Sequence, residues 1–352
     1  MSTSVPAVST EQFHYISHHN NMMAIRYILS IYVILGHIAI LTQIDIPYVY
    51  DSRLAVGGFF ALSGFLLFPS FQRSQSLKHY VSKRARRILP PYILIVVLCA
   101  FLLFPFSILS PIDYFLNANT WKYLAANLAF LNFLHPSLPG VFEDTTFYTS
   151  AVNGSLWTMK GEWLCYLSIP LIFTLMKSKK KILWGVFLLS LVIISGVTEY
   201  VLTTVGTHTG VALYHTFAKQ FGTMFSFFYT GALINLYLPF FLKYRWPSAI
   251  SALLILLTGD VIPGYEYFWL PIAISVLVLF ASLFGDWGYH LSKHDNVSYD
   301  MYLFHFPIIQ IAVYYHIPEA LPAWLLVTII IVITYLFGLI SWNCIGKHIL
   351  QH

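Results

Sequence analysis

A histidine and an arginine share one face of the first apolar segment of this 352-residue chain. Arg26 opens the segment and His37 lies eleven residues later, a spacing that on an α-helix rises about 16 Å and returns to nearly the same face. Ser30 and Val33 lie between them on this face. A histidine inside a hydrocarbon layer is costly unless it faces a bundle interior or a cavity. We interpret His37 as a site residue; a core histidine bonded to a neighbouring helix is the alternative.

A carboxylate lies in a later apolar segment. Four polar side chains recur there at three- and four-residue spacing and so share a helix face: Ser155, Thr158, Glu162 and Tyr166. A carboxylate in lipid must be protonated, paired or solvated. Glu162 is therefore a candidate for orienting a histidine or holding a proton. A salt bridge to Lys160 or to another helix is the structural alternative.

The segment VSYDMYLFHFPII carries a second histidine. Ser298, Tyr302 and His305 fall on one face of the expected helix, whereas Asp300 points elsewhere. Pro307 follows, and a proline inside a helix predicts a kink. The polar face is consistent either with a structural network or with a direct chemical role.

Arginines stand near the ends of other apolar segments. Arg84 and Arg87 form an R-x-x-R pair in an expected loop that ends at Pro90-Pro91. Clustered arginines bind phosphate bidentately, although an anchor for anionic lipids explains the pair as well. Arg53 precedes the second segment, where it could meet an anionic or polyhydroxylated ligand or reach lipid headgroups.

The elements that must position these residues are membrane helices. Hydrophobic residues make up 58% of the chain and charged residues 9%, whereas a soluble domain carries about a quarter charged residues. Apolar stretches of about 20 residues recur along the chain. We predict an all-α, polytopic bundle of about ten transmembrane helices. The expected spans are 22–42, 55–71, 89–107, 155–176, 182–200, 221–241, 247–262, 268–285, 297–315 and 322–344.

The distribution of lysine and arginine predicts the orientation of the bundle. With the N-terminus in the cytoplasm, the inside loops hold most basic residues, at 73–87, 177–181, 243–245, Lys293 and Lys347. This pattern obeys the positive-inside rule and places both termini in the cytoplasm. We predict cytoplasmic tails at 1–21 and 346–352 around one membrane domain at 22–345, with no removable signal peptide.

Other features narrow the class of protein. The sequence lacks the aromatic-interleaved basic stripe of nucleic-acid binders, and we find no inverted repeat of the kind many transporters show. The cysteines, Cys99, Cys165 and Cys344, lie in apolar runs and are interpreted as small core residues. The expected outside loop at 108–154 is long enough to be functional, or it simply caps the bundle.

Five segments resemble the acyltransferase-3 family of membrane acyltransferases, in the family's order over about 24–310. They are Arg26-x10-His37, FFALSGFLL at 59–67, Arg84-x-x-Arg87 with Pro90-Pro91, SLWTMKGEWLCY and SYDMYLFHFP. The resemblance implies an enzyme of the bacterial cytoplasmic (inner) membrane. It would move acetyl or another acyl group from cytoplasmic acetyl-CoA or acyl-CoA to a sugar hydroxyl of a cell-envelope or exported polysaccharide. The acceptor would be a glycan or a lipid-linked saccharide, with membrane lipids around the domain and no metal.

The resemblance also implies roles for individual residues. His37 is expected to be catalytic, Arg26 to be its partner, and Arg84 and Arg87 to match the family's R-x-x-R motif. Glu162 matches the family's acidic position. We expect Arg26, Arg84 and Arg87 to bind the coenzyme A phosphates. We assign Glu162 and His305 to the catalytic group, and Arg53, Tyr166 and Tyr302 to substrate binding.

The chain departs from the family pattern at several positions. Thr158-Met159 replaces Ser-Leu, Trp163 stands where many members carry a second acid, Gly57-Gly58 replaces a Val-Asp or Val-Pro pair, and Asp300 is unusual. These departures leave the acceptor open. We expect no room for the extracytoplasmic hydrolase-like domain that some members carry, so the membrane domain would transfer directly or use a separate protein.

The expected chemistry is deprotonation of the acceptor hydroxyl by His37 and attack on the thioester, with Glu162 or His305 orienting the imidazole. A covalent acyl intermediate on His37 or on a tyrosine is the variant. A transporter or flippase of a glycan or acyl-group precursor is the alternative function, and a non-catalytic membrane scaffold is a third.

Overall fold

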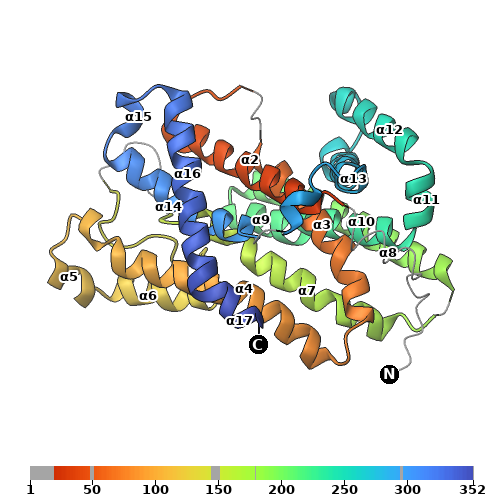
Figure 1. The fold of residues 1–352 in the computed structure, drawn as a ribbon, viewed down its shortest axis with the longest axis horizontal. Coiled ribbons are helices and arrows are strands. Elements are labelled where there is room, and N and C mark those ends of the chain that lie inside the picture. Colours follow the sequence, from red (N-terminus) through yellow and green to blue (C-terminus); the bar gives the residue numbers. More distant parts are fainter. Residues whose placement is uncertain (1–19, 48–50, 144–150, 179, 294–295, 352) are drawn as a thin grey trace. The chain divides into compact units, whose positions relative to one another are not determined.

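Helices are the regular secondary structure of the described residues, and turns and loops connect them. The structure is a computed structural model, and it describes residues 20–47, 51–143, 151–178, 180–293 and 296–351. Six of the described helices are long and apolar enough to cross a membrane. They are Met22–Thr42, Ser52–Gln72, Leu77–Leu102, Lys181–Thr209, Tyr265–Leu283 and Ala323–Ile349. By their length and composition, these six helices are candidate membrane spans of a multi-pass protein (Figure 1).

Each expected span overlaps a helix in sequence. The first half of the chain holds α2 Met22–Thr42, α3 Ser52–Gln72, α4 Leu77–Leu102, α5 Pro111–Leu116, α6 Ala118–Leu128 and α7 Trp157–Leu175. The middle holds α8 Lys181–Thr209, α9 Ala212–Phe217, α10 Met224–Leu236, α11 Leu238–Lys243 and α12 Arg245–Leu257. The last part holds α13 Leu270–Leu283, α14 Ser298–Tyr314, α15 Ile317–Ala320, α16 Ala323–Ser341 and α17 Lys347–Gln351.

Four expected spans correspond to helices outside the group of six. They are α7, α10, α12 and α14, which have 19, 13, 13 and 17 residues. The helical path of α10 is longer than its own bounds, because α9 leads into it through the π-helical turn Ala218–Thr223. A count of about ten spans therefore remains a prediction. The expected tail at 1–21 lies almost wholly outside the described residues.

The chain divides into two compact units. The first contains 20–29, 53–80 and 161–293, and the second contains 30–52, 81–160 and 296–351, as far as these ranges are described. Helices α2, α3, α4 and α7 contribute residues to both units.

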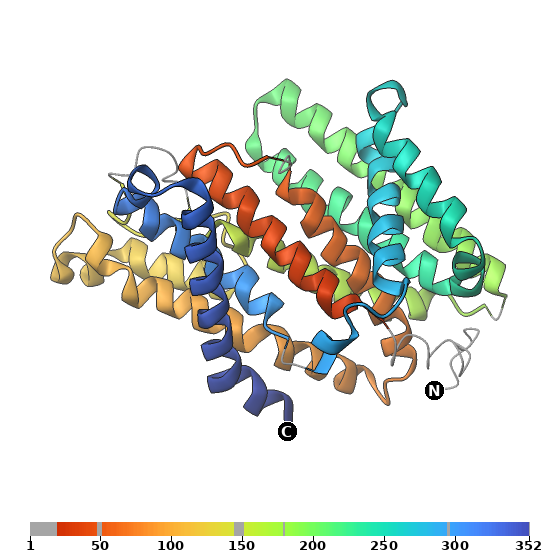
Figure 2. The same ribbon diagram turned by 45° about the horizontal axis from the view of Figure 1, so that its top comes forward.

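In the first unit, α3 and α10 approach through glycines. A Cβ added at Gly64 would lie 1.8 Å from the carbonyl oxygen of Phe228, and one at Gly231 would lie 2.0 Å from that of Ala61. Small residues let membrane helices approach this closely. Farther along the chain, α12 packs beside α13, as both views show (Figures 1 and 2).

Asn21 ties the start of α2 to the end of α13 within the first unit. Its Nδ2 donates to the carbonyl of Phe284 at 2.7 Å, and its Oδ1 accepts from the backbone N–H of Gly288 at 2.7 Å. Asn21 is fully buried. The side chain is therefore a clamp between distant segments, just before the turn that carries Arg26.

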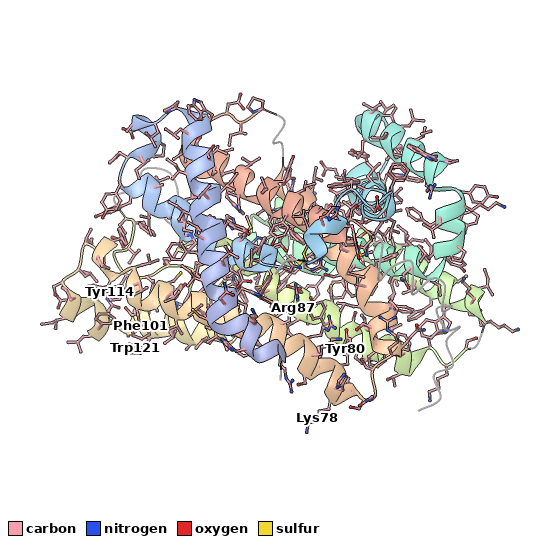
Figure 3. The ribbon with its side chains drawn as sticks, viewed as in Figure 1. Lys78, Tyr80, Arg87, Phe101, Tyr114 and Trp121 are labelled. Carbon is pink, nitrogen blue, oxygen red and sulfur yellow. The ribbon has the colours of Figure 1, made fainter. Side chains whose placement is uncertain are left out.

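In the second unit, α14 is largely buried and packs along α16 (Figure 2). The long segment after α4 is held to it by α5 and α6: the Tyr114 hydroxyl donates to the Ala100 carbonyl at 2.9 Å, and Trp121 packs edge-on against Phe101. Burial raises the pKa of Tyr114, so its hydroxyl stays protonated and donates. The rings of Phe101, Tyr114 and Trp121 lie together at the end of α4 (Figure 3).

Two expectations from the sequence were wrong. Arg84 and Arg87 lie within α4 rather than in a loop, because the helix begins at Leu77 and continues through Pro90-Pro91. The residues before the prolines include Lys83 and Arg86, which are good helix formers. Of the cysteines, Cys99 and Cys165 are buried as expected, whereas Cys344 is exposed.

Candidate active site

His37 and His305 form a hydrogen-bonded pair in the second unit. Nδ1 of His37 lies 2.8 Å from Nε2 of His305, and the ring centroids are 4.9 Å apart. His305 is fully buried in α14. Phe306 packs edge-on against His37 with a centroid distance of 5.2 Å. The structure thus joins two residues that lie 268 positions apart in the chain.

The hydrogen bonds around the pair indicate which nitrogens carry protons. Nδ1 of His305 lies 3.3 Å from the carbonyl oxygen of Met301, and only a protonated nitrogen can bond to a carbonyl. Nε2 of His305 is then the acceptor, and Nδ1 of His37 is the donor. The lone pair of His37 therefore resides on Nε2, where it can accept a proton from a substrate.

Two contacts set the register of α2 against α14. The Ser30 hydroxyl donates to the carbonyl oxygen of Ser298 at 2.8 Å, and the histidine pair follows seven residues later on each helix. Seven residues are about two helical turns, so the two helices run parallel here. Ser30 and His37, which share a face of α2, both bond to α14, and Val33 between them on this face is fully buried.

The segment that leads into α7 lies along α14 in the opposite direction. Nε2 of Gln310 donates to the carbonyl of Ala151 at 3.1 Å, and the Tyr302 hydroxyl donates to that of Ser155 at 3.1 Å. Tyr302 also lies 2.9 Å from the Thr158 hydroxyl. These bonds fix the ring of Tyr302 next to His305, at a centroid distance of 5.9 Å. Its expected contact with substrate remains a prediction.

The arginine pair of α4 belongs to the same unit. Arg84 and Arg87 are three residues apart on a helix and so lie on one side of α4. Arg87 interacts electrostatically with Asp300, and the Tyr299 hydroxyl donates to the Ile88 carbonyl at 3.2 Å. Arg87 lies about halfway along α4, well away from Phe101 (Figure 3). The start of α14 therefore supports the part of α4 that carries the arginines.

Other candidate residues lie in the first unit. Arg26 is half-buried in α2, and Arg53 is exposed at the start of α3. The Tyr166 hydroxyl donates to Oε1 of Glu162, one turn earlier on α7. Lys160, one alternative ion-pair partner for Glu162, belongs to the second unit, where its ammonium lies 4.3 Å from the ring centroid of Phe133. The roles of Arg26, Arg53, Glu162 and Tyr166 remain predictions.

Sequence reasoning found both histidines and named His305 and Glu162 as the two candidates to orient His37, and the structure pairs His37 with His305. Sequence reasoning placed Ser30 on the same face of α2 as His37 but did not identify Ser298 as its partner. It also did not recognise that Asn21 joins two distant segments. An asparagine directly before a helix reads as an N-terminal cap, whereas Asn21 bonds to another segment of the chain. Among the described residues, no three His, Cys, Asp or Glu side chains come together in a group that could hold a metal ion.

Comparison with known proteins identifies the family. The acyltransferase domain of the acyltransferase-3 family matches residues 20–343, so the chain belongs to this family. A curated relative, the O-acetyl transferase of Shigella phage Sf6, is 28% identical over 149 residues. That match covers 40% of this chain and 42% of the relative, so the chain matches less than half the relative's length. No solved structure matches the chain significantly.

Proposed function

We propose that this chain is an O-acyltransferase of the bacterial cytoplasmic membrane. It moves an acyl group, most simply acetyl, from cytoplasmic acyl-coenzyme A to a hydroxyl of a surface or exported polysaccharide. The observation that carries the proposal is the pair formed by His37 and His305, with a 2.8 Å separation between their nitrogens. Membership of the acyltransferase-3 family and the O-acetyl transferase relative support the same reaction.

In the proposed reaction, Nε2 of His37 takes the proton of the acceptor hydroxyl. At the same time the hydroxyl oxygen forms a bond to the carbonyl carbon of the thioester. The tetrahedral intermediate then loses coenzyme A as the carbon–sulfur bond breaks. The departing thiolate takes the proton from His37, which restores the neutral ring. His305 acts by orientation: its Nε2 accepts from Nδ1 of His37, and this bond strengthens when His37 becomes charged.

The donor is proposed to bind through its phosphates. Arg84 and Arg87 share one side of α4 and present guanidinium groups suited to phosphate. Arg26 is a further phosphate ligand, about 16 Å along α2 from His37. Such a distance suits a donor with phosphates at one end and a thioester at the end of a long thin arm. The proposal includes about ten spans and cytoplasmic termini, as the distribution of basic residues indicates.

Mass spectrometry of surface glycans tests the proposal in cells. Wild-type protein and His37→Ala are compared at equal membrane levels, with Thr328→Val as a control that removes an exposed hydroxyl of α16 outside the pair. We expect an acetyl-sized mass on a glycan that is present with wild type and the control and is absent with His37→Ala. Identical acylated glycans in all three would contradict the proposal.

Release of coenzyme A thiol separates an acyltransferase from a transporter. Purified wild-type protein is given acetyl-coenzyme A with and without the glycan identified in cells. We expect thiol release that depends on the acceptor. Movement of glycan across a vesicle membrane without thiol release would favour the transporter.

A further inference from the structure

Pro307 interrupts the hydrogen bonding of α14 next to the histidine pair. In a regular helix the carbonyl of Leu303 would accept from the backbone N–H four residues later, but that residue is Pro307, which has no N–H. Leu303 is fully buried. A buried carbonyl without a donor destabilises the fold, so another group is needed at this point.

Asn153 supplies the missing donor. Its Nδ2 donates to the carbonyl oxygen of Leu303 at 2.9 Å. Its Oδ1 accepts from the backbone N–H of Ser155 at 3.1 Å and from the Ser155 hydroxyl at 2.6 Å. Because an N–H can only donate, these bonds also assign the amide orientation. Asn153 is 5% exposed, so every bond is shielded from water.

The residue after Asn153 supports the other histidine. Phe306 lies against Gly154 so closely that a Cβ on this glycine would come within 2.5 Å of the ring. The same ring packs edge-on against His37. The two residues 153–154 therefore contact the turn of α14 that holds His305, and the ring that flanks His37.

We propose that Asn153 is a positioning residue for the His37–His305 pair. It replaces the backbone donor that Pro307 removes, and thereby fixes the α14 turn from Leu303 to Pro307 that carries His305. The inference rests on the proposed function only where His37 is taken as the base. The geometric claim concerns the pair itself and can be tested without transfer activity.

The proline provides a specific rescue. Pro307→Ala restores a backbone N–H for the Leu303 carbonyl, so Asn153 becomes dispensable in that background. Asn153→Leu removes the donor at similar side-chain size. We compare wild type, each single variant and the double variant. Gln310→Leu, alone and with Pro307→Ala, is the matched control, because it removes an amide–carbonyl bond between the same two segments elsewhere.

Two measurements are made on protein purified in detergent. The first is the turnover of acetyl-coenzyme A with acceptor. Asn153→Leu is expected to lower kcat by about tenfold or more, with the donor KM nearly unchanged, because misplacement of a catalytic group acts on the chemical step. The double variant is expected within about threefold of Pro307→Ala. Any loss of kcat caused by Gln310→Leu is expected to persist when Pro307→Ala is added.

The second measurement is the rate at which diethyl pyrocarbonate labels His305, read by peptide mass spectrometry. We expect faster labelling in Asn153→Leu, because Nε2 of His305 loses its close partner, and a return to the slow rate in the double variant. Rescue of labelling in a protein without transfer activity would support the positioning role and contradict the proposed function.

Three results would overturn the inference. One is wild-type kcat and labelling in Asn153→Leu. Another is a double variant that remains as impaired as Asn153→Leu while Pro307→Ala is active. If Asn153→Leu alone does not fold, Pro307→Ala is compared with the double variant instead. A double variant with a much lower kcat than Pro307→Ala contradicts the inference.

Discussion

Ser341 donates a hydrogen bond to Oδ1 of Asp300 at 2.5 Å, and this bond joins α16 to the start of α14. Asp300 is 3% exposed, and it also interacts with Arg87 on α4. The carboxylate therefore accepts a hydrogen bond from α16 and interacts favourably with the charge of an arginine proposed to bind the donor. A buried carboxylate is stable only when paired or hydrogen-bonded, and the Ser341 hydroxyl provides the hydrogen bond.

Loss of the charge on Asp300 is expected to weaken donor binding. Asp300→Asn keeps the shape and an oxygen for the Ser341 hydroxyl but removes the attraction for Arg87. We predict a rise in the KM for acetyl-coenzyme A of about fivefold, equivalent to about 1 kcal/mol, with kcat nearly unchanged. Steady-state kinetics at fixed acceptor concentration measure this. Thr328→Val removes an exposed hydroxyl that bonds within α16, leaves Asp300 and Ser341 unchanged, and serves as the control. An unchanged donor KM in Asp300→Asn would contradict the role of Arg87.

Removal of the Ser30 hydroxyl tests the register between α2 and α14. Ser30→Ala leaves the carbonyl of Ser298 without this donor and is expected to lower the free energy of unfolding by about 1 kcal/mol. A several-fold loss of kcat should accompany it, because the histidine pair lies two turns further along the same contact. Thermal unfolding and turnover are measured together.

The matched control for Ser30 is Thr328→Val. The Thr328 hydroxyl donates to the carbonyl of Trp324 within α16 and is exposed. Its loss is therefore expected to change neither the free energy of unfolding nor kcat. Equal effects of the two substitutions would show that the bond from Ser30 to Ser298 has no special importance.

At the contact between α3 and α10, neither glycine is predicted to tolerate replacement by a residue with a side chain. Gly64→Ala and Gly231→Ala each place a Cβ within 2.0 Å of a backbone oxygen on the other helix, so the helices must move apart. We expect a loss of at least about 2 kcal/mol of stability or failure to accumulate in the membrane. Gly338→Ala is the control, since its added Cβ would meet no atom closer than 3.5 Å. Normal stability of Gly64→Ala would contradict the close packing.

The sequence predicted the polar faces of single helices well. The spacing from Arg26 to His37 placed Ser30 and Val33 on a contact face, and both are fully buried. The pattern in α14 likewise placed Ser298, Tyr302 and His305 on an inward side, and all three are buried. These inferences depend only on helical periodicity, which is a local property of the chain.

Pairings between helices could not be predicted in the same way. The bond from His37 to His305 depends on the parallel register of two helices that are distant in sequence, and periodicity carries no information on register. Pro90-Pro91 suggested a helix start, whereas α4 begins at Leu77 and continues through both prolines. Pro307 did carry an unused signal: a proline within a buried helix implies a carbonyl that needs a donor from elsewhere.

The most direct test of the central claim is a double-mutant cycle on kcat with His37→Gln, His305→Gln and the double variant. We predict that His37→Gln lowers kcat by about a hundredfold or more. Adding His305→Gln should then cost little, because residues that act as a unit give non-additive losses. Independent losses that multiply in the double variant would contradict the claim that the two histidines act as one acid–base unit.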